Sequence, residues 1–149
     1  MKIKAMLDEG AILPTRAHET DAGLDLYTPI DVIVPRCRWI PTEGITLGSA
    51  TIGTGIHVEI PKGYAGFIKS KSGLAVKHGL TAAGGVIDSG YTGSVVVKLF
   101  NHTSISYEFK AGEKIAQLVI LPIITPDLEV VDSLEDTDRG SNGFGSSGK

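Results

Sequence analysis

Residues 56–60 read IHVEI, residues 94–100 read SVVVKLF and residues 114–121 read KIAQLVIL. The first stretch alternates apolar and polar side chains and stops at Pro61, which is the period of a half-buried strand. The other two stretches are rich in β-branched residues, which favour strands. These three segments therefore predict β-strands, and they decide the fold class.

Shorter runs around them extend the same pattern. Gly, Pro, Asp and Asn separate the runs at intervals of about 8 to 12 residues, which is the spacing of all-β sandwiches and barrels. A short helical turn is predicted over 72–77, and residues 42–54 are interpreted as a surface loop. Five further strands are predicted: 3–7, 24–27, 32–34, 64–68 and 129–131.

Composition limits the class of protein. A chain of 149 residues with 42% hydrophobic and 21% charged residues is typical of one globular domain. The net charge of −3 argues against a partner such as DNA or RNA, because such binding needs a basic face. No apolar run approaches about 18 residues, so no membrane span is predicted.

Cysteine and histidine usage narrows the chemistry. Cys37 is the single cysteine, so neither a disulfide framework nor a cysteine metal cluster is expected within one chain. The four histidines lack the close spacing of a zinc site. Acidic residues follow the first Met within nine positions, which is unlike a signal peptide. The expected location is a reducing cytoplasm.

The segment 84–93, GGVIDSGYTG, carries the clearest candidate chemistry. Its glycines predict a β-hairpin turn. Bare glycines also expose backbone N–H and C=O groups that can bind the edge of a planar base. Asp88 is a candidate general base for water, and Tyr91 offers a flat face to a sugar.

Two other stretches suit a phosphate ligand. Residues 69–75, KSKSGLA, combine small hydroxyls, ammonium groups and a glycine at a helix start, although a solvated basic turn remains the alternative. Residues 112–118, GEKIAQL, place Gln117 on one strand face, where it is either exposed or functional.

The C-terminal stretch departs from the strand pattern. Residues 127–138 contain six acids and no base, and residues 139–149 read RGSNGFGSSGK. Glycine and serine favour a flexible spacer. Because a spacer has no use for an arginine and a phenylalanine, closure over a ligand is the other interpretation. We expect a domain over 1–138 and an arm over 139–149.

Five of these segments together resemble the trimeric dUTP pyrophosphatase (dUTPase) family. They span the whole chain in the family's order, as AGLDLY (22–27), SKSGLA (70–75), GGVIDSGYTG (84–93), GEKIAQL (112–118) and RGSNGFGSSG (139–148). The resemblance implies a jelly-roll-like β-barrel and a homotrimer with three active sites at its subunit interfaces. The implied reaction is hydrolysis of dUTP to dUMP and pyrophosphate, with Mg²⁺ on the triphosphate, which would limit uracil incorporation into DNA and supply dUMP for thymidylate synthesis.

The resemblance also implies a role for each matching residue. Asp88 would activate the attacking water near the ribose 3′-hydroxyl, and Tyr91 would pack under the deoxyribose. Asp25 would either support the water shell of the metal or be structural. Lys114 would contribute only the electrostatic field of its charge. The implied substrate-binding residues are Gly85, Val86 and Ile87 at uracil, Lys71, Ser72, Gly73 and Gln117 at the phosphates, and Arg139, Phe144, Gly145, Ser146 and Ser147 in the closing arm.

The sequence departs from the family pattern at several positions. Lys71 stands where arginine is usual, so a planar bidentate donor is replaced by a point charge. Asn142 and Ser147 stand where glycine and threonine are more usual. The stretch 42–54 is longer than the family minimum.

Two alternative functions remain open on the same scaffold. The first is dCTP deaminase, whose family carries a catalytic glutamate where this chain has Lys98. The second is a nucleotide-binding regulatory module without turnover, which the replacement at Lys71 and the changed arm would favour.

Overall fold

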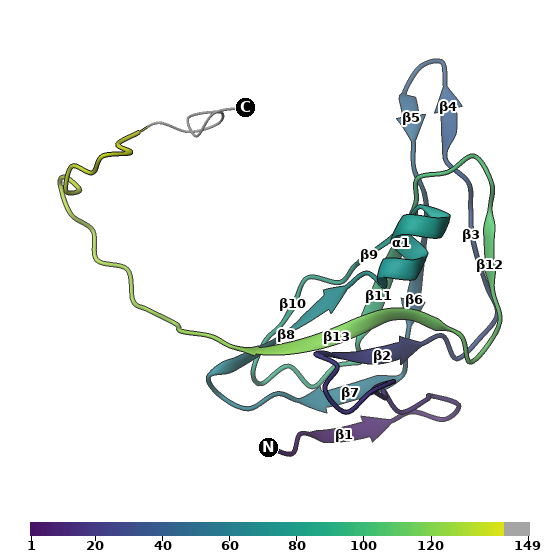
Figure 1. Ribbon diagram of the computed structural model, residues 1–149, viewed down its shortest axis with the longest axis horizontal. Helices are drawn as coiled ribbons and strands as arrows, with labels where there is room; N and C mark the ends of the chain where they lie inside the picture. Colours follow the sequence, from purple (N-terminus) through teal and green to yellow (C-terminus); the bar gives the residue numbers. More distant parts are fainter. Residues whose placement is uncertain (142–149) are drawn as a thin grey trace.

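Strands make up nearly all of the regular structure in the computed structural model, which describes residues 1–141 (Figure 1). The largest sheet has the order β10-β8-β13-β2, and a second sheet has the order β6-β11-β9. The members of the first sheet are β10 (Val86–Ile87), β8 (Tyr64–Lys69), β13 (Lys114–Pro122) and β2 (Gly23–Tyr27), and those of the second are β6 (Gly48–Gly53), β11 (Val96–Asn101) and β9 (Leu80–Ala83).

Three antiparallel pairs complete the strands described in 1–141. The pair β4–β5 forms a hairpin that stands out from the body (Figure 1), with Trp39 opposite Ile45 and both side chains exposed. The helix α1 (Ser72–His78) follows β8 and ends at Gly79. The pairs are β1 (Lys4–Leu7) with β7 (Ile56–Glu59), β3 (Val32–Val34) with β12 (Tyr107–Phe109), and β4 (Arg38–Ile40) with β5 (Gly44–Thr46).

One apolar core lies between the sheets. Strand β7 buries Ile56 and Val58 and turns His57 and Glu59 outward, as the alternation predicts. Strand β11 buries Val97 and Leu99 in the same way. The arrangement is the all-β, jelly-roll-like fold predicted from the sequence, with its strands in separate small sheets.

Most predicted elements are confirmed, and two are wrong. The seven strands that begin between residues 3 and 114 and the turn at 72–77 correspond to β1, β2, β3, β7, β8, β11, β13 and α1. Residues 129–131 form no strand, because they lie in a segment that leaves the sheets. Residues 42–54 are not a surface loop: they contain β5 and β6, and β6 buries Ile52 against the core.

The hairpin predicted over 84–93 is only partly correct. The Tyr91 N–H donates to the Asp88 carbonyl over 3.1 Å, which closes a turn. The strand before that turn, β10, pairs with Phe67 and Gly66 of β8. The chain after the turn does not pair with β10 and instead continues into β11 of the other sheet. The segment therefore bridges two sheets.

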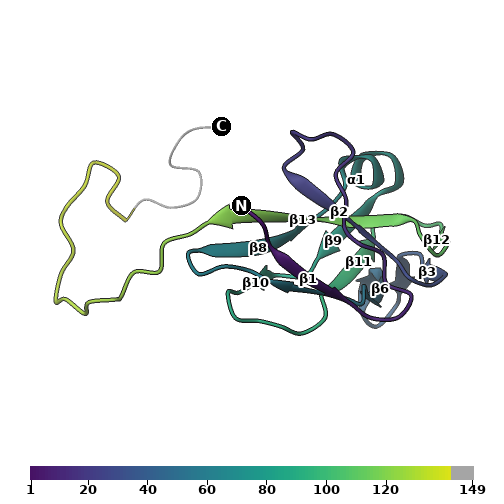
Figure 2. The same ribbon diagram turned by 90° about the horizontal axis from the view of Figure 1, so that it is seen from below.

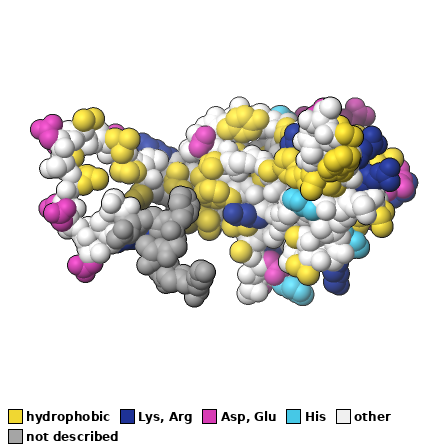
Figure 3. All heavy atoms as spheres, turned by 90° about the horizontal axis from the view of Figure 1, so that it is seen from above, with side chains coloured by type: hydrophobic (Ala, Val, Ile, Leu, Met, Phe, Trp, Pro, Cys, Tyr) yellow, Lys and Arg dark blue, Asp and Glu magenta, His cyan; other side chains and the backbone are white. Residues whose placement is uncertain are grey.

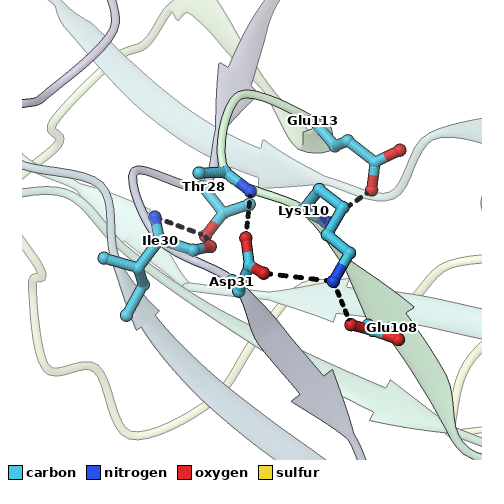
Figure 4. A network of polar contacts seen from close by, with 7 residues as sticks. Thr28, Ile30, Asp31, Glu108, Lys110 and Glu113 are labelled. Carbon is cyan, nitrogen blue, oxygen red and sulfur yellow. Dashed lines mark hydrogen bonds and ion pairs between the residues drawn. The ribbon is translucent and has the colours of Figure 1, made fainter.

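Charged side chains fasten the β2–β3 connection to the β12–β13 turn (Figure 4). Asp31 accepts a 2.9 Å hydrogen bond from the Ala111 N–H and a 3.1 Å bond from Lys110 Nζ. Glu113 accepts from the Lys110 N–H. The backbone hydrogen bond, followed by that from Lys110, holds the pKa of Asp31 below its ordinary value. These contacts fix the turn from which β13 enters the large sheet.

After β13 the chain runs away from the body as an extended segment (Figures 1 and 2). Acidic and apolar side chains both lie on its surface (Figure 3). Leu128 is 95% exposed and Val130 is 97% exposed. No helix in the described part of the chain is long and apolar enough to cross a membrane.

Candidate active site

A small cavity opens beside the loop that follows β10. Gly84, Val86, Ile87, Asp88 and Tyr91 line it from one side, and the start of β11 lines it from the other. The carboxylate of Asp88 is exposed, whereas Ile87 is buried and fixes the end of β10 in the core. The cavity volume is about 150 Å³. That is smaller than the roughly 300–1,000 Å³ of ordinary ligand pockets.

Backbone geometry in this loop depends on glycine at two places. Gly85 has φ of 68°, which favours glycine, and a Cβ built on it would meet no atom within 4 Å, so the space on that side of its Cα is open. A Cβ on Gly93 would lie 2.4 Å from the Tyr91 hydroxyl oxygen. The Tyr91 ring thus packs over Gly93, and its hydroxyl donates to the Ser94 carbonyl over 3.1 Å.

A second, larger cavity of about 410 Å³ lies beside the opposite end of β8. Gln117 forms part of its wall and donates a 3.0 Å hydrogen bond to the Ser70 carbonyl. Gly23 packs against it: a Cβ there would lie 2.1 Å from Gln117 Oε1, so a larger residue would displace the Gln117 side chain. Three ammonium groups and two carboxylates line this cavity: Lys69, Lys71, Lys114, Asp21 and Asp25.

Asp25 holds two of these ammonium groups at once. Its carboxylate forms ion pairs with Lys71 and, over 2.7 Å, with Lys114, while the residue itself is only 5% exposed. Burial alone raises the pKa of Asp25, but the hydrogen bonds from Lys114 and Lys71 outweigh it and hold that pKa below its ordinary value. The same contact raises the pKa of Lys114. Asp25 therefore anchors the two lysines at this wall.

The remaining candidate phosphate residues begin α1. Ser72 and Gly73 are exposed in its first turn, and a Cβ on Gly73 would meet nothing within 4 Å. Lys71 precedes the helix in an extended conformation; its ammonium can only donate, so it caps no backbone N–H group and pairs with Asp25. The backbone at this turn is therefore open to a ligand.

The two cavities lie towards opposite ends of β8. Val86 pairs with Phe67 and Ile87 with Gly66, so the next residue, Asp88, lies near the Ala65 end. Gln117 pairs with Lys69 at the other end, and α1 follows from there. Ala65 and Lys69 are separated by about 13 Å at 3.3 Å per residue. Within one chain, β10 thus runs away from the phosphate-type residues towards Asp88.

Part of the predicted arm lies beyond the described residues. Arg139 is exposed and lies within the turn at 137–140, near the end of the extended segment. Phe144, Gly145, Ser146 and Ser147 lie outside the described range of 1–141.

Comparison with known proteins decides the family. The family model described as dUTPase matches residues 9–148. The chain belongs to the dUTPase family.

Relatives of this dUTPase carry one activity in their names. It is 42% identical to the deoxyuridine 5′-triphosphate nucleotidohydrolase of Solanum lycopersicum over 95% of this chain and 78% of the relative. It is 43% identical to that of Paramecium bursaria Chlorella virus 1, over 95% and 94%. The dUTPase is accordingly a dUTP diphosphatase, an enzyme that hydrolyses dUTP to dUMP.

Solved structures resemble this dUTPase over nearly its whole length. The dUTPase of Staphylococcus bacteriophage 80alpha with dUPNHPP has a TM-score of 0.85 and 32% identity, covering 99% of both chains. A variant of the dUTPase from phage phi11 of S. aureus, described with a structural Mg(II) ion, has a TM-score of 0.77 and 29% identity, covering 91% of this chain and 100% of that one.

Two groups beside the dUTPase site were missed by the sequence reasoning. One is the pairing of Asp25 with both lysines, which depends on β13 lying between β2 and β8. The other is His57, which contacts the loop after β10 from outside the cavity. Its only sequence signal was a histidine on the polar face of a predicted strand.

Proposed function

We propose that this dUTPase cleaves the bond between the α- and β-phosphates of dUTP at sites that two or more copies of the chain share. Asp88 holds the attacking water, and the products are dUMP and pyrophosphate. The observation that carries the proposal is the position of Asp88, exposed at a cavity with open glycine backbone and an aromatic ring. Such activity would limit uracil incorporation into DNA and supply dUMP for thymidylate synthesis.

Uracil recognition belongs to β10 in this proposal. β10 is an edge strand, so one side of its backbone bonds to β8 and the other side is free. Gly85, Val86 and Ile87 can therefore offer N–H and C=O groups to the edge of a base. Uracil presents one N–H between two carbonyls, and cytosine reverses part of that pattern. A mismatched base would leave buried polar groups unpaired, which discriminates strongly.

Tyr91 and Asp88 act on the next parts of the nucleotide. The Tyr91 ring, fixed over Gly93, packs under the deoxyribose and leaves no room for a 2′-hydroxyl. Asp88 is exposed two residues beyond Val86, where it accepts the proton of the water that attacks the α-phosphate. The reaction needs no covalent nucleophile, because water displaces pyrophosphate directly.

The phosphates require residues from another copy. A nucleotide whose base lies at Gly85 and whose α-phosphate lies at Asp88 points away from Ser72 and Gln117 of the same chain. A neighbouring copy would supply Lys71, Ser72, Gly73 and Gln117 to the triphosphate. Lys71 serves here as a point charge already oriented by Asp25.

The extended segment supports assembly into a homotrimer. Four apolar side chains in it are at least 87% exposed, and a single copy offers them no cover. A neighbouring copy can cover them, and residues 139–149 would then reach a site as a closing arm. In that arm Arg139, Ser146 and Ser147 would bind the outer phosphates, with Phe144 over uracil and Gly145 between them. The exposed apolar residues are Ile124, Leu128, Val130 and Leu134.

Magnesium fits as a companion of the substrate rather than a resident of the protein. The described residues contain no group of three His, Cys, Asp or Glu side chains able to hold a metal. Asp25 has both oxygens paired with lysines, which supports its structural role. The residues near the triphosphate are donors and cations, which suit phosphate oxygens carrying Mg²⁺. When bound, Mg²⁺ would neutralise phosphate charge and ease departure of pyrophosphate.

The test is pyrophosphate release from dUTP, dCTP, dTTP and UTP, with and without Mg²⁺. We expect release from dUTP alone, stimulated by Mg²⁺. Asp88→Asn should lose at least 100-fold in kcat while still binding nucleotide, because the base is removed and the pocket is kept. Ammonia from dCTP would support the deaminase alternative, although Lys98 offers an ammonium rather than a carboxylate. Binding of dUTP without turnover would support the regulatory module.

A further inference from the structure

His57 lies outside both cavities of the site, but its ring joins two segments that the backbone leaves apart. Nδ1 lies 2.7 Å from the carbonyl oxygen of Thr92, and Nε2 lies 3.2 Å from Oδ1 of Asp8. Thr92 directly follows Tyr91 in the loop proposed to bind substrate, and Asp8 follows β1. The His57 side chain is 19% exposed, whereas its partner Asp8 is 56% exposed, so the ring is largely sheltered and the carboxylate is in contact with water.

The contact extends an anchor that the backbone begins. The Val95 N–H donates to the Ile56 carbonyl over 2.7 Å, and Thr54 binds the Val95 carbonyl. These bonds fix the loop at its β11 end, as β8 fixes it at β10. With His57 bound to Thr92, the unanchored stretch shortens to about the turn that holds Asp88 and Tyr91. Without it, the free stretch extends to residue 94.

Both partners of the ring are acceptors. The Thr92 carbonyl and the Asp8 carboxylate can only accept, so each ring nitrogen needs a proton to bond with both. The imidazolium has two N–H groups and satisfies both partners. The neutral ring has one N–H, for which the carbonyl and the carboxylate compete. Each neutral tautomer therefore leaves one lone pair facing an oxygen.

We propose that His57 and Asp8 position the substrate loop through the Thr92 carbonyl, and that this brace is complete only when the imidazole carries both protons. His57 is a positioning residue in this proposal, since it lies behind the loop and not in the cavity. The inference rests on the proposed role of residues 85–91 in binding dUTP.

The electrostatic surroundings favour the doubly protonated ring. The hydrogen bond to Thr92 and then that to Asp8 raise the pKa of His57 above its ordinary value. A third cavity, of about 230 Å³, is lined by His57 and Thr92 together with Lys4 of β1 and Glu59 of β7. Lys4 and Glu59 pair with each other over 3.1 Å. The loop itself carries Asp88 as its one carboxylate. The brace is therefore complete at low pH and weakens as pH rises through this raised pKa.

Replacing Asp8 gives the sharpest variant. In Asp8→Asn the amide can turn its NH₂ towards Nε2, which stabilises the neutral ring with its proton on Nδ1. The Thr92 bond then persists without the second proton. In His57→Gln no group titrates at this position. Lys4→Gln is the matched control, because it removes a charge from the same cavity without touching the ring.

The experiment measures KM and kcat for dUTP from about pH 6 to 8.5, a range that brackets histidine titration, on the assembled enzyme. Substrate ionisation is common to all variants, so differences between them isolate His57. For wild type and Lys4→Gln we expect KM to rise about threefold to tenfold across the His57 titration, the range of one hydrogen bond, with kcat nearly constant. Asp8→Asn should keep the low-pH KM at every pH, and His57→Gln should lose the rise of KM with pH.

A second measurement does not depend on activity. Protection of the amides of residues 89–93 against hydrogen exchange, after division by the intrinsic exchange rate at each pH, should fall in the substrate-free protein as His57, followed by its NMR signals, loses its proton. Asp8→Asn should abolish that change. The proposal is overturned if loop exchange ignores the titration, or if both variants raise KM equally at every pH. If either result is found while the enzyme still hydrolyses dUTP, the proposed function stands and only the role of His57 is wrong. If the loop responds to the titration but dUTP is not hydrolysed, the proposed function is wrong and the role of His57 stands.

Discussion

The position of the Tyr91 side chain is determined by its close neighbours in the sequence. Its ring packs over Gly93, where a Cβ would collide, and its hydroxyl donates to the Ser94 carbonyl. Both contacts lie within four residues, so the ring is placed by the loop itself. The ring is 47% exposed, and the exposed part is available to a sugar.

We predict that Tyr91→Ala raises kcat/KM for UTP relative to dUTP by about tenfold, because the wall against a 2′-hydroxyl is removed. Tyr91→Phe keeps the ring and should keep most of the discrimination. Competition between the two nucleotides in one assay measures the ratio. An unchanged ratio in Tyr91→Ala would remove this residue from sugar selection.

Asp25 illustrates a residue whose role the sequence left open. With its carboxylate removed, Lys71 and Lys114 would keep their charges beside each other without a counter-ion. We predict that Asp25→Asn lowers the free energy of unfolding at neutral pH by about 1–2 kcal/mol, less than for a fully buried pair because Lys114 is partly hydrated.

The pH dependence of that loss follows from the lowered pKa of Asp25. Its contribution to stability is present above the carboxyl pKa of the unfolded chain, about 4, and disappears as pH falls through the folded pKa. The difference between wild type and Asp25→Asn in urea unfolding should therefore shrink at acid pH. A difference that stays constant down to about pH 2 would contradict the ion-pair account.

At the scale of elements, Asn101 organises the turn after β11. It is fully buried, donates to the carbonyls of Ile105 and Val34, and accepts from the N–H and hydroxyl of Thr103. The turn thus closes around one side chain. The Val34 bond also ties that turn to β3.

We predict that Asn101→Ala lowers the free energy of unfolding by about 2–4 kcal/mol, because several buried groups lose partners. Ile105→Ala is the control: its side chain is 75% exposed, so only a few tenths of a kcal/mol should change. Chemical denaturation of both variants provides the comparison. Equal stabilities would mean that water replaces the amide of Asn101.

The elements differ in how far sequence alone determines them. The alternation of apolar and polar residues predicted β7 correctly, because one face of that strand packs on the core and the other is exposed to water. It missed β6, whose sequence GSATIG is poor in β-branched residues but pairs with β11 along its whole length. It also predicted a strand at 129–131, where β-branched residues are present but no partner strand lies among residues 1–141. Pairing over long sequence distances decided these cases.

Motifs in the sequence named the candidate site residues but not their arrangement in space. Motif spacing identified Asp88, Tyr91 and Gln117 as candidates, and the family is confirmed. Their separation along β8 follows from strand register, which the motifs do not contain. The lysine pairing of Asp25 and the contact of His57 with Thr92 likewise depend on tertiary structure.

At the scale of the whole molecule, the division between a domain over 1–138 and an arm over 139–149 stays a proposal. The sheets end at Pro122, and the extended segment carries the chain outward (Figure 2). We predict that deleting 139–149 lowers kcat/KM for dUTP at least tenfold without changing the number of copies in the assembly, because the arm closes the site but does not build it.

A full-length chain with Arg139→Ala and Phe144→Ala tests whether the arm acts through these two side chains or through its length. We expect its dUTP turnover to be nearly as low as that of the deletion. Light scattering and dUTP turnover measure assembly and catalysis in each variant. A truncated chain with normal turnover would favour the spacer interpretation of the tail.

The central claim is that each site combines Asp88 from one copy with Ser72 and Gln117 from another. It is tested most directly by mixing two inactive chains, Asp88→Asn and the double variant Ser72→Ala with Gln117→Ala, through joint unfolding and refolding. Random assembly of equal amounts should restore about one quarter of wild-type dUTP turnover, since one site in four would draw both intact sets. Mixed assemblies that form, as shown by mass, but remain inactive would contradict the shared site.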